Sequence, residues 1–315
     1  MQIVITDGYA LNPGDLSWRA FDQLGELVYY DRTLPDQAGE RCSAADVIIT
    51  NKTTINEETI NAAINLKAIA VTATGYNIVD ILAARRRGIP VCNVPEYGTD
   101  SVAQHAFALL LELANQVGRH ARSVNEGEWQ QSIDWCYAKT PLIELNDKTL
   151  GLIGFGRIAQ QMTRIARAFG MEVIYYSRSA KSTLAKAVPI QTVFEESDFI
   201  SLHCPLTPDN HSFINAKLLS LMKPTAYLIN TARGQLIHEA DLAAALRNGV
   251  LAGAALDVLA MEPPPAGHPL IGLPNCLITP HNAWMSREAR QRIMQTTFEN
   301  VKAALAGKPP NVVNS

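Results

Sequence analysis

The sequence predicts an α/β protein with two doubly wound parallel sheets, each in a domain of its own. Three observations support this prediction. Short β-rich runs alternate with helical stretches along most of the chain, an order that is typical of parallel β-α-β units. A length of 315 residues suits about two domains. A glycine-rich turn, Gly154–Ala159, follows a β-rich run in the second half, whereas the first half contains no such fingerprint.

The first hundred residues predict one complete β-α series. The strands are expected at Ile3–Thr6, Val28–Tyr30, Val47–Thr50, Ala68–Thr72 and Pro90–Val94. The helices are expected at Leu16–Leu24, Asn56–Ala62 and Val79–Arg87. Gly88 closes the last of these helices, as glycine often does.

A long Ala- and Leu-rich helix, Asp100–Gly118, interrupts the alternation, and its apolar positions surround the helix, which predicts burial. A second series of strands follows at Thr149–Ile153, Glu172–Tyr176, Phe199–Leu202, Ala226–Asn230, Gly253–Leu256 and Cys276–Thr279. The last helix, about Arg287–Ala306, has the length to return and pack on the first domain. We therefore predict a discontinuous first domain, residues 1–99 and 285–315, with a nucleotide-binding domain inserted at 100–284.

Composition and charge exclude several classes of partner. The net charge of −3 gives no basic surface for nucleic acid, and no apolar run reaches the length of about 18 residues that a membrane span needs. The chain begins directly with a β-rich run, without the features of a signal peptide. The five cysteines are scattered and form no Cys-x-x-Cys pair, which predicts reduced thiols and no metal site. We therefore expect a cytoplasmic protein.

The glycine-rich turn predicts a dinucleotide site. It lies between the predicted strand Thr149–Ile153 and the predicted helix Ile158–Phe169, an order that places a helix N-terminus against a pyrophosphate. Gly154 allows the tight turn, Gly156 allows close approach of the phosphate, and Ala159 takes the third glycine position. The residues expected at the cofactor are Gly154, Phe155, Gly156, Arg157 and Ile158. The alternative is a glycine turn that only joins strand to helix.

The residues after the next strand select between NAD and NADP. About 20 residues beyond the glycine turn, an NAD enzyme usually places an acidic residue on the ribose 2′-hydroxyl. This chain has Ser177 and Arg178 there, with Lys181 nearby, and no carboxylate to repel a 2′-phosphate. We therefore expect NADP to be favoured, with NAD possible. The alternative is a solvated basic loop with no role in cofactor choice.

A candidate catalytic set follows three of the predicted strands: Arg233, Glu262 and His281. Ligands bind at the carboxyl ends of strands in open α/β sheets. Hydride addition to a keto carbon builds negative charge on its oxygen, and a histidine can supply the proton. A carboxylate can orient the ring, and the planar fork of arginine can bind a substrate carboxylate. The set therefore predicts reduction of a 2-keto acid.

Each of these three residues has an ordinary structural alternative. A histidine after a strand is often a capping residue, an Arg-Gly pair is often a turn, and Glu-Pro often opens a loop. Their co-occurrence behind a dinucleotide turn favours the catalytic interpretation. His203 also follows a strand and is expected to line the adenosine side. The histidines that lack a strand end combined with a nearby acid are His105, His120, His211, His238 and His268.

With these segments in place, the chain resembles the D-isomer-specific 2-hydroxyacid dehydrogenases over essentially its full length. The resemblance is carried by residues 74–77, Gly154–Ala159, His203–Thr207, Asn230–Gly234, Asp257–Pro263 and Pro280–Trp284. It implies a flavodoxin-like substrate domain, a Rossmann nucleotide domain and an active-site cleft between them. The chain departs from the family pattern at Ala159 and at Ser177, where an acidic residue is common.

The resemblance also implies roles for individual residues. Arg233 binds the substrate, Glu262 orients the imidazole and His281 donates the proton. The expected substrate ligands are Lys52, Thr74, Gly75, Arg233 and His281. The expected cofactor ligands beyond the glycine turn are Ser177, Arg178, His203, Pro205, Thr231, Ala232 and Asp257.

Within the family, the likeness is greatest to the glycerate dehydrogenase, or hydroxypyruvate/glyoxylate reductase, branch. It is carried by Thr50–Lys52, Glu128–Tyr137 and His281–Trp284. It implies a homodimer in which an arm bearing Trp135 reaches the partner, whereas the alternative buries Trp135 in its own domain. Two other functions stay open: another D-2-hydroxyacid specificity, such as D-lactate or a branched-chain keto acid, and a non-catalytic, nucleotide-sensing protein of the corepressor type.

Overall fold

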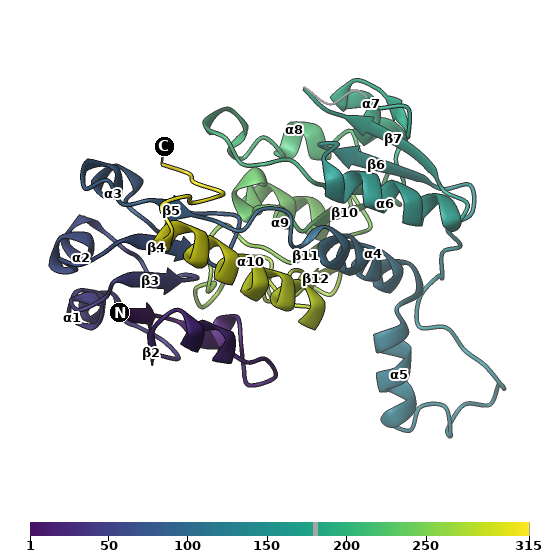
Figure 1. Cartoon of the computed structure of the whole chain (residues 1–315). Coiled ribbons are helices and arrows are strands. Elements are labelled where there is room, and N and C mark those ends of the chain that lie inside the picture. Colours follow the sequence, from purple (N-terminus) through teal and green to yellow (C-terminus); the bar gives the residue numbers. More distant parts are fainter. Residues whose placement is uncertain (179–181, 315) are drawn as a thin grey trace. The chain divides into compact units, whose positions relative to one another are not determined.

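The computed structural model describes residues 1–178 and 182–314 and divides into two compact units (Figure 1). One unit consists of Met1–Gly98 together with the chain from Met285 onward, and the other is Thr99–Trp284. Each unit contains one sheet in which all neighbouring strands are parallel. The α/β prediction with two doubly wound parallel sheets is therefore confirmed.

The first unit has a five-stranded sheet in the order β2-β1-β3-β4-β5. Its strands are β1 (Gln2–Ile5), β2 (Glu26–Tyr29), β3 (Val47–Thr50), β4 (Ala68–Val71) and β5 (Val91–Cys92). This is the strand order of the flavodoxin-like fold. The central strands are buried runs of Val, Ile and Ala, as expected for a sheet that is covered on both faces.

Helices cover both faces of this sheet. They are α1 (Ala38–Cys42), α2 (Glu57–Ala62), α3 (Ile81–Arg86) and α10 (Arg287–Leu305). Alternate residues of β3 point to opposite faces: Ile48 packs with the cluster that includes α1, α2 and α3 residues, whereas Ile49 packs with Val301 of α10. The sheet of the first unit has a second apolar face, and the last helix returns to this unit because it covers that face.

Local signals set the ends of two of these helices. The side chain of Asn56 accepts a hydrogen bond from the Thr59 N–H at the start of α2, and that of Asp80 does the same for Ala83 at the start of α3. The predicted helix Leu16–Leu24 was wrong in type, because the chain forms only a short 3-10 helix at Arg19–Gln23. Only Phe21 of that segment is fully buried, with Trp18 and Leu24 partly buried against the same core, which is too little buried surface to support a longer helix.

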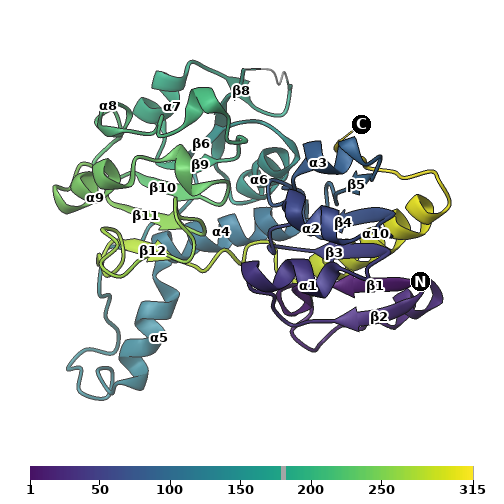
Figure 2. The same cartoon turned by 90° about the vertical axis from the view of Figure 1, so that its left-hand side faces the viewer.

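The second unit has a seven-stranded sheet in the order β12-β11-β10-β9-β6-β7-β8 (Figure 2). Its strands are β6 (Thr149–Ile153), β7 (Glu172–Tyr176), β8 (Lys186–Ala187), β9 (Phe199–Leu202), β10 (Tyr227–Asn230), β11 (Gly253–Leu256) and β12 (Cys276–Ile278). Counted within the unit, this is the Rossmann order extended by one strand. The direction of strand addition reverses between β6 and β9, and such a switch point is where these folds bind their ligands.

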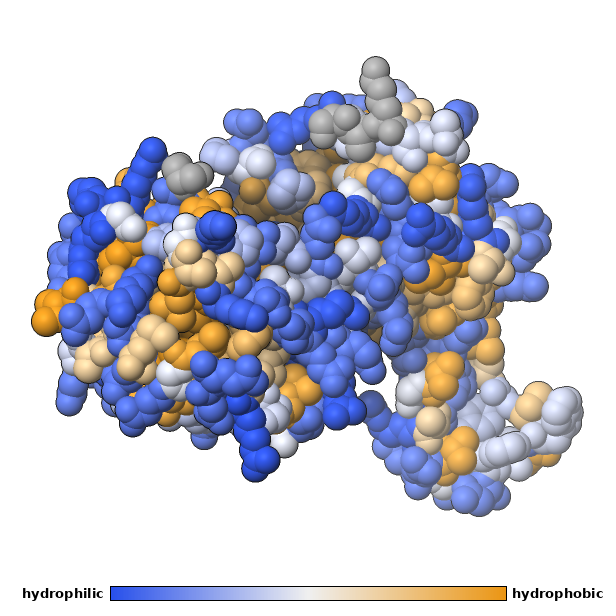
Figure 3. Space-filling model, in the orientation of Figure 1, coloured by the Kyte–Doolittle hydropathy of each residue, from blue (hydrophilic) through white to orange (hydrophobic). Residues whose placement is uncertain are grey.

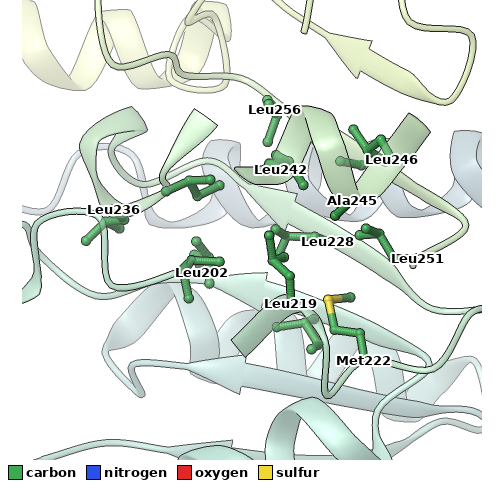
Figure 4. Close-up of a cluster of buried hydrophobic side chains, with 14 of the residues drawn as sticks. Leu202, Leu219, Met222, Leu228, Leu236, Leu242, Ala245, Leu246, Leu251 and Leu256 are labelled. Atoms are coloured by element: carbon green, nitrogen blue, oxygen red, sulfur yellow. The ribbon is translucent and has the colours of Figure 1, made fainter. Parts of the chain in front are cut away.

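The helices of the second unit are α4 (Thr99–Asn115), α5 (Val117–Asn125), α6 (Arg157–Ala168), α7 (Ile190–Glu196), α8 (Ala216–Leu219) and α9 (Glu239–Arg247). All of them except α5 pack on one face or the other of its sheet. Residues of α4 and α6 form one buried cluster with the sheet. Residues of α7, α8 and α9 form the other, in which Leu219, Leu242 and Leu246 pack over Leu228 (Figure 4).

The predicted single helix Asp100–Gly118 is divided in the structure. It breaks at Gln116, which adopts a left-handed backbone conformation with φ of 47°, and α5 begins at the next residue. The carboxylate of Glu112 accepts the Gly118 N–H near the break. The expected burial of this helix holds for most of the α4 surface. Its buried residues are Ala103, Ala106, Phe107, Leu109, Leu110 and Ala114, and only a narrow strip with Asp100, Gln104, Ala108 and Asn115 is exposed.

Beyond the break, α5 and residues 126–142 form an arm that projects from the rest of its unit (Figure 1). Apolar side chains on this arm are exposed, and Figure 3 shows apolar patches on it. Ile133 is fully exposed and Trp135 is 86% exposed, so the alternative that buries Trp135 in its own domain was wrong.

Among the described residues, no helix combines the length and the apolar character that crossing a membrane requires.

Candidate active site

The glycine-rich turn lies at the switch point, directly against the turn that follows β9. Gly154 has φ of +89°, and its N–H donates to the Tyr176 carbonyl. A Cβ added to Gly154 would lie 2.7 Å from the carbonyl carbon of His203 and the nitrogen of Cys204. Only glycine suits both the conformation and the close approach, so the two turns meet as one surface.

The next part of the turn leaves room for a ligand. A Cβ added to Gly156 would meet no atom within 4 Å, and Gly156 is the N-cap of α6 without a side chain that caps the helix. The helix N-terminus therefore presents backbone N–H groups and the positive end of its dipole toward this space. Ala159 is fully buried, which lets α6 pack closely on the sheet. These features fit the pyrophosphate of a dinucleotide.

The strand that precedes the selectivity position, β7, ends at Tyr176, so Ser177 and Arg178 follow it directly. The Arg178 side chain is 61% exposed, and its guanidinium lies 3.9 Å from the carboxylate of Asp209, which is more exposed still. A surface pair of this length contributes little stability, so Arg178 can turn to another anion at small cost. Lys181 lies outside the described residues.

His203 carries no charge at neutral pH. Burial lowers its pKa to about 4, although part of the residue remains accessible. Its Nε2 lies 2.9 Å from the hydroxyl of Ser201, within hydrogen-bond distance. Pro205, two residues further on, is exposed. The turn after β9 therefore offers a neutral ring and an apolar ring beside the glycine turn, as expected for the side of the site that would take an adenosine.

His281 and Glu262 form a direct pair. The His281 Nδ1 lies 2.6 Å from the Glu262 Oε2, and both side chains are about one-third exposed, at 32% and 35%. The second carboxylate oxygen, Oε1, accepts the Leu259 N–H at 2.9 Å, which fixes the direction of the acid. Because the carboxylate accepts at Nδ1, the proton of the neutral ring lies there, and Nε2 is the nitrogen turned away from the acid.

The loop that presents His281 is built around a buried carboxylate. Asp257 is 1% exposed, and it accepts hydrogen bonds from the Thr279 hydroxyl and from the N–H groups of Asn282 and Ala283. Its backbone carbonyl accepts the His281 N–H at 2.8 Å. His281 itself has φ of 51°, a conformation that needs such support. The Asp257 side chain therefore holds the loop that carries His281, and its predicted contact with the cofactor stays a prediction.

Arg233 lies on a turn that follows β10. Asn230 shapes this turn, because its Oδ1 accepts the Ala232 N–H and its Nδ2 donates to the Arg233 carbonyl. The guanidinium is exposed and donates to the Ala232 carbonyl at 2.7 Å. The hydroxyl of Thr231 is buried and has no hydrogen-bond partner among the described residues, so a ligand that reaches it would find a donor and acceptor to satisfy.

Gly234 joins this turn to the acid. A Cβ added to Gly234 would overlap the carbonyl group of Leu259 and the nitrogen of Ala260. The Arg233 turn is thus packed against the backbone that leads to Glu262. The structure brings Glu262 and His281 into direct contact and links Arg233 to them through this packing.

Three of the predicted substrate ligands belong to the first unit. The backbone N–H of Lys52 donates to the carboxylate of Asp7, which also accepts from Asn51 and Thr53. The Thr74 hydroxyl donates to the Val94 carbonyl at 2.9 Å. Both Lys52 and Thr74 follow strands of the first sheet, β3 and β4, and Gly75 comes next. Their contact with a substrate stays a prediction.

Another histidine lies beside an acid that its sequence context does not reveal. His268 follows no strand end with an acid nearby in the sequence, yet its Nε2 lies 3.1 Å from the carboxylate of Glu239. His238 likewise lies beside Asp241. His238 and Asp241 are three positions apart at a helix start, so their contact can be read from the sequence. Glu239 and His268 are 29 positions apart, and no sequence spacing signals their contact.

Comparison with known proteins decides the family. Residues 107–283 match the model of the D-isomer specific 2-hydroxyacid dehydrogenase, NAD binding domain. The chain belongs to this dehydrogenase family. The family match and the two parallel sheets confirm the resemblance and the two α/β domains expected from it.

Relatives within the family cover the whole chain. A hydroxypyruvate reductase of Blautia hydrogenotrophica is 44% identical over 321 residues, which cover 100% of both proteins. A glycerate dehydrogenase of Methylorubrum extorquens is 39% identical over 304 residues, 96% of each. A solved acyclic imino acid reductase in complex with NADPH and D-Arg is 34% identical, with a TM-score of 0.85 over 99% of this chain and 100% of that one. The protein is therefore an oxidoreductase of this dehydrogenase family.

Proposed function

We propose that this dehydrogenase reduces small 2-keto acids, hydroxypyruvate or glyoxylate, to D-glycerate or glycolate with a reduced nicotinamide cofactor. The observation that carries the proposal is the 2.6 Å contact between His281 and Glu262 at the ends of two neighbouring strands of a Rossmann sheet. The names of the hydroxypyruvate reductase and the glycerate dehydrogenase among its relatives support the choice of substrate.

The inserted domain, residues 100–284, would hold the cofactor. Gly154–Ile158 at the N-terminus of α6 would bind its pyrophosphate, and the turns at His203–Pro205 and Thr231–Ala232 would contact the rest. When bound, the nicotinamide supplies the hydride that adds to the keto carbon of the substrate. The open space at Gly156 and the unsatisfied hydroxyl of Thr231 support this placement.

His281 supplies the proton. In the reductive direction the ring is protonated, and Nε2 donates to the oxygen of the former carbonyl as the C–H bond forms. Glu262 supports this form of the ring, because a carboxylate that accepts at Nδ1 stabilises the imidazolium and sets its orientation. The ring is left neutral after transfer and regains a proton from solvent, to which it is one-third exposed.

Arg233 binds the carboxylate of the keto acid. Its guanidinium is exposed and, among the described residues, donates to the Ala232 carbonyl of its own turn, so its remaining N–H groups can make a two-bond contact with a substrate carboxylate. The residues 1–99 and 285–315 form the substrate domain, from which Lys52, Thr74 and Gly75 complete the substrate contacts. The family resemblance at these positions supports that assignment.

We propose that NADP is the preferred cofactor and that NAD is also accepted. Ser177 does not repel a 2′-phosphate, and the exposed guanidinium of Arg178 can bond it. The imino acid reductase that this chain resembles was solved with NADPH, which supports the proposal. The pairing of Arg178 with Asp209 lowers the expected preference for NADP, because the Asp209 carboxylate competes with a 2′-phosphate for the guanidinium.

The arm of α5 and residues 126–142 is proposed to bind a second copy of the chain. Exposure of Ile133, Trp135 and Trp129 on one arm is unusual for a surface that faces only water, and it suits a homodimer interface. The indole N–H of Trp129 donates to the Trp135 carbonyl, so the tip of the arm has its own internal structure. Trp135 is then placed to reach the substrate pocket of the partner.

A panel of 2-keto acids, assayed by absorbance with NADPH and with NADH, tests the function. Turnover of hydroxypyruvate or glyoxylate above that of pyruvate and branched-chain keto acids supports the proposal. Preference for pyruvate would replace it with a D-lactate type of specificity. Binding of the nucleotide without turnover of any 2-keto acid would instead favour a nucleotide-sensing role.

A further inference from the structure

The acid of the catalytic pair lies on a long loop. Between β11 and β12, residues 257–275 contain no helix or strand. Glu262 lies in the part of this loop, 261–267, whose residues are all exposed. An exposed segment of this kind is not held by core packing, yet the Glu262 carboxylate must stay within hydrogen-bond distance of His281. Something outside the segment therefore has to hold it.

One carboxylate binds both ends of the segment. Glu239, the first residue of α9, accepts the Ala260 N–H at Oε1, 2.8 Å away. Its Oε2 lies 3.1 Å from the Nε2 of His268. Ala260 and His268 flank the exposed residues on either side, so Glu239 closes the base of the loop that carries Glu262.

The protonation of His268 suits this arrangement. Its ring is almost fully buried, and its Nδ1 accepts the Leu270 N–H at 3.4 Å. The proton of the neutral ring therefore lies on Nε2 and is donated to Glu239. A carboxylate that is mostly removed from water needs such donors, and both of its oxygens have one.

The Ala260 peptide is held on its other side as well. Its carbonyl accepts from the side-chain amide of Gln235 at 2.9 Å, and the backbone of Gly234 packs against Leu259. Leu259 in turn donates its N–H to Glu262. A continuous set of contacts therefore runs from Glu239 through residues 259–260 to the Glu262 carboxylate and on to His281.

We propose that Glu239, paired with His268, is a positioning residue that holds Glu262 against His281. It does not touch the reacting atoms. Its kinetic consequence rests on the proposed function, whereas its effect on the His281–Glu262 hydrogen bond does not. Loss of the Glu239 contacts with Ala260 and His268 frees the base of the loop and lets Glu262 leave the Nδ1 of His281. The imidazolium then loses its support, and turnover falls.

The variant Glu239→Ala removes both contacts, and Glu239→Gln keeps an acceptor for Ala260 but cannot accept from His268. Asp241→Ala is the matched control, because Asp241 lies on the same first turn of α9 but accepts from Ala216 and pairs with His238. We expect Glu239→Ala to lower kcat about ten- to a hundredfold, the range for misplacement of a catalytic group by around an ångström, with KM and cofactor affinity little changed. Glu239→Gln should lose less, and Asp241→Ala should keep wild-type kcat.

A double-mutant cycle separates positioning from general destabilisation. If Glu239 acts through Glu262, the variant Glu239→Ala with Glu262→Gln should be no slower than Glu262→Gln alone. Multiplied losses of kcat would overturn the proposal, as would an equal loss in Asp241→Ala.

The hydrogen bond can be observed without any substrate. In protein with isotope-labelled histidine, the Nδ1–H resonance of His281, assigned with His281→Ala, should lose its hydrogen-bonded position in Glu262→Gln and also in Glu239→Ala. An unchanged resonance in Glu239→Ala would overturn the proposal. If the keto acid panel shows no turnover, this measurement still decides the role of Glu239. Failure of the proposed function and failure of the proposed positioning role of Glu239 are therefore distinct outcomes.

Discussion

Gly234 lies so close to Leu259 that a side chain on Gly234 would overlap the Leu259 carbonyl group. This contact joins the turn that carries Arg233 to the backbone that carries Glu262. Two of the three candidate catalytic residues therefore share one packed backbone junction, and the third, His281, is bonded to Glu262.

Gly234→Ala should destabilise the protein and lower its activity. Backbone groups cannot move away as a flexible side chain can, so we expect a loss of about 1–3 kcal/mol or more in the free energy of unfolding. Denaturant unfolding and turnover with hydroxypyruvate measure the two effects. Gly39→Ala is the control, because a Cβ there meets no atom within 4 Å and it should not destabilise. Equal stability of both variants would show that the junction adapts freely.

His281→Ala should reduce turnover by about a hundred- to ten-thousandfold, the range for loss of a general acid. The proposed nucleotide site is formed by other turns, so the affinity for the reduced cofactor, measured by fluorescence titration, should survive. Wild-type turnover in this variant would remove His281 from the mechanism.

Glu262→Gln should lower kcat. The carboxylate accepts at the His281 Nδ1 over 2.6 Å and sets the orientation of the ring, whereas the amide is a weaker, neutral acceptor and can also turn its N–H groups toward the ring. We expect a loss of about ten- to a hundredfold with the KM for the keto acid little changed, the range for a misplaced catalytic group. Steady-state kinetics of the wild type and the variant check this. Wild-type kcat in the variant would make Glu262 purely structural.

Ser177→Asp combined with Arg178→Ala should reverse the preference for NADPH. A charge-assisted bond to the 2′-phosphate is worth about 1.5–3 kcal/mol, and each 1.4 kcal/mol is tenfold, so the wild type should prefer NADPH by about ten- to a hundredfold. Because the Arg178 side chain is exposed, we expect a preference for NADPH near the lower end of this range.

The change should appear in the cofactor KM, because the phosphate is remote from the hydride. Asp209→Asn is a useful second variant, since removal of the competing acid should raise the preference for NADPH. Equal efficiency of the two cofactors in the wild type would contradict the assignment.

Trp135→Ala should weaken both self-association and keto acid binding. The indole is 86% exposed on the arm, so its loss should not unfold the chain, but it would remove a large apolar anchor from an interface. Sedimentation and KM for the keto acid measure the two effects. Ile64→Ala, an exposed apolar position on the first unit, is the control and should change neither. A wild type that is monomeric in solution would exclude the role of the arm.

The sequence by itself determined the elements with strong periodic signals. The buried strands at 47–50, 149–153, 199–202 and 253–256 were predicted with the bounds that the structure gives them, because continuous apolar runs between turns have few other uses in a parallel sheet. The pairing of His281 with Glu262 could be expected for a related reason. Parallel strands end at one edge of their sheet, and both residues come soon after adjacent strands.

Only the tertiary structure decided where weak local preferences were overridden or where distant residues meet. The segment at 16–24 has helical composition but too little buried surface to form more than a short 3-10 helix. Gln116 ends α4 in a left-handed conformation that no residue preference of glutamine predicts. The contact of Glu239 with His268 and the overlap that requires Gly234 depend on how loops fold over a sheet, and such contacts leave no periodic trace in the sequence.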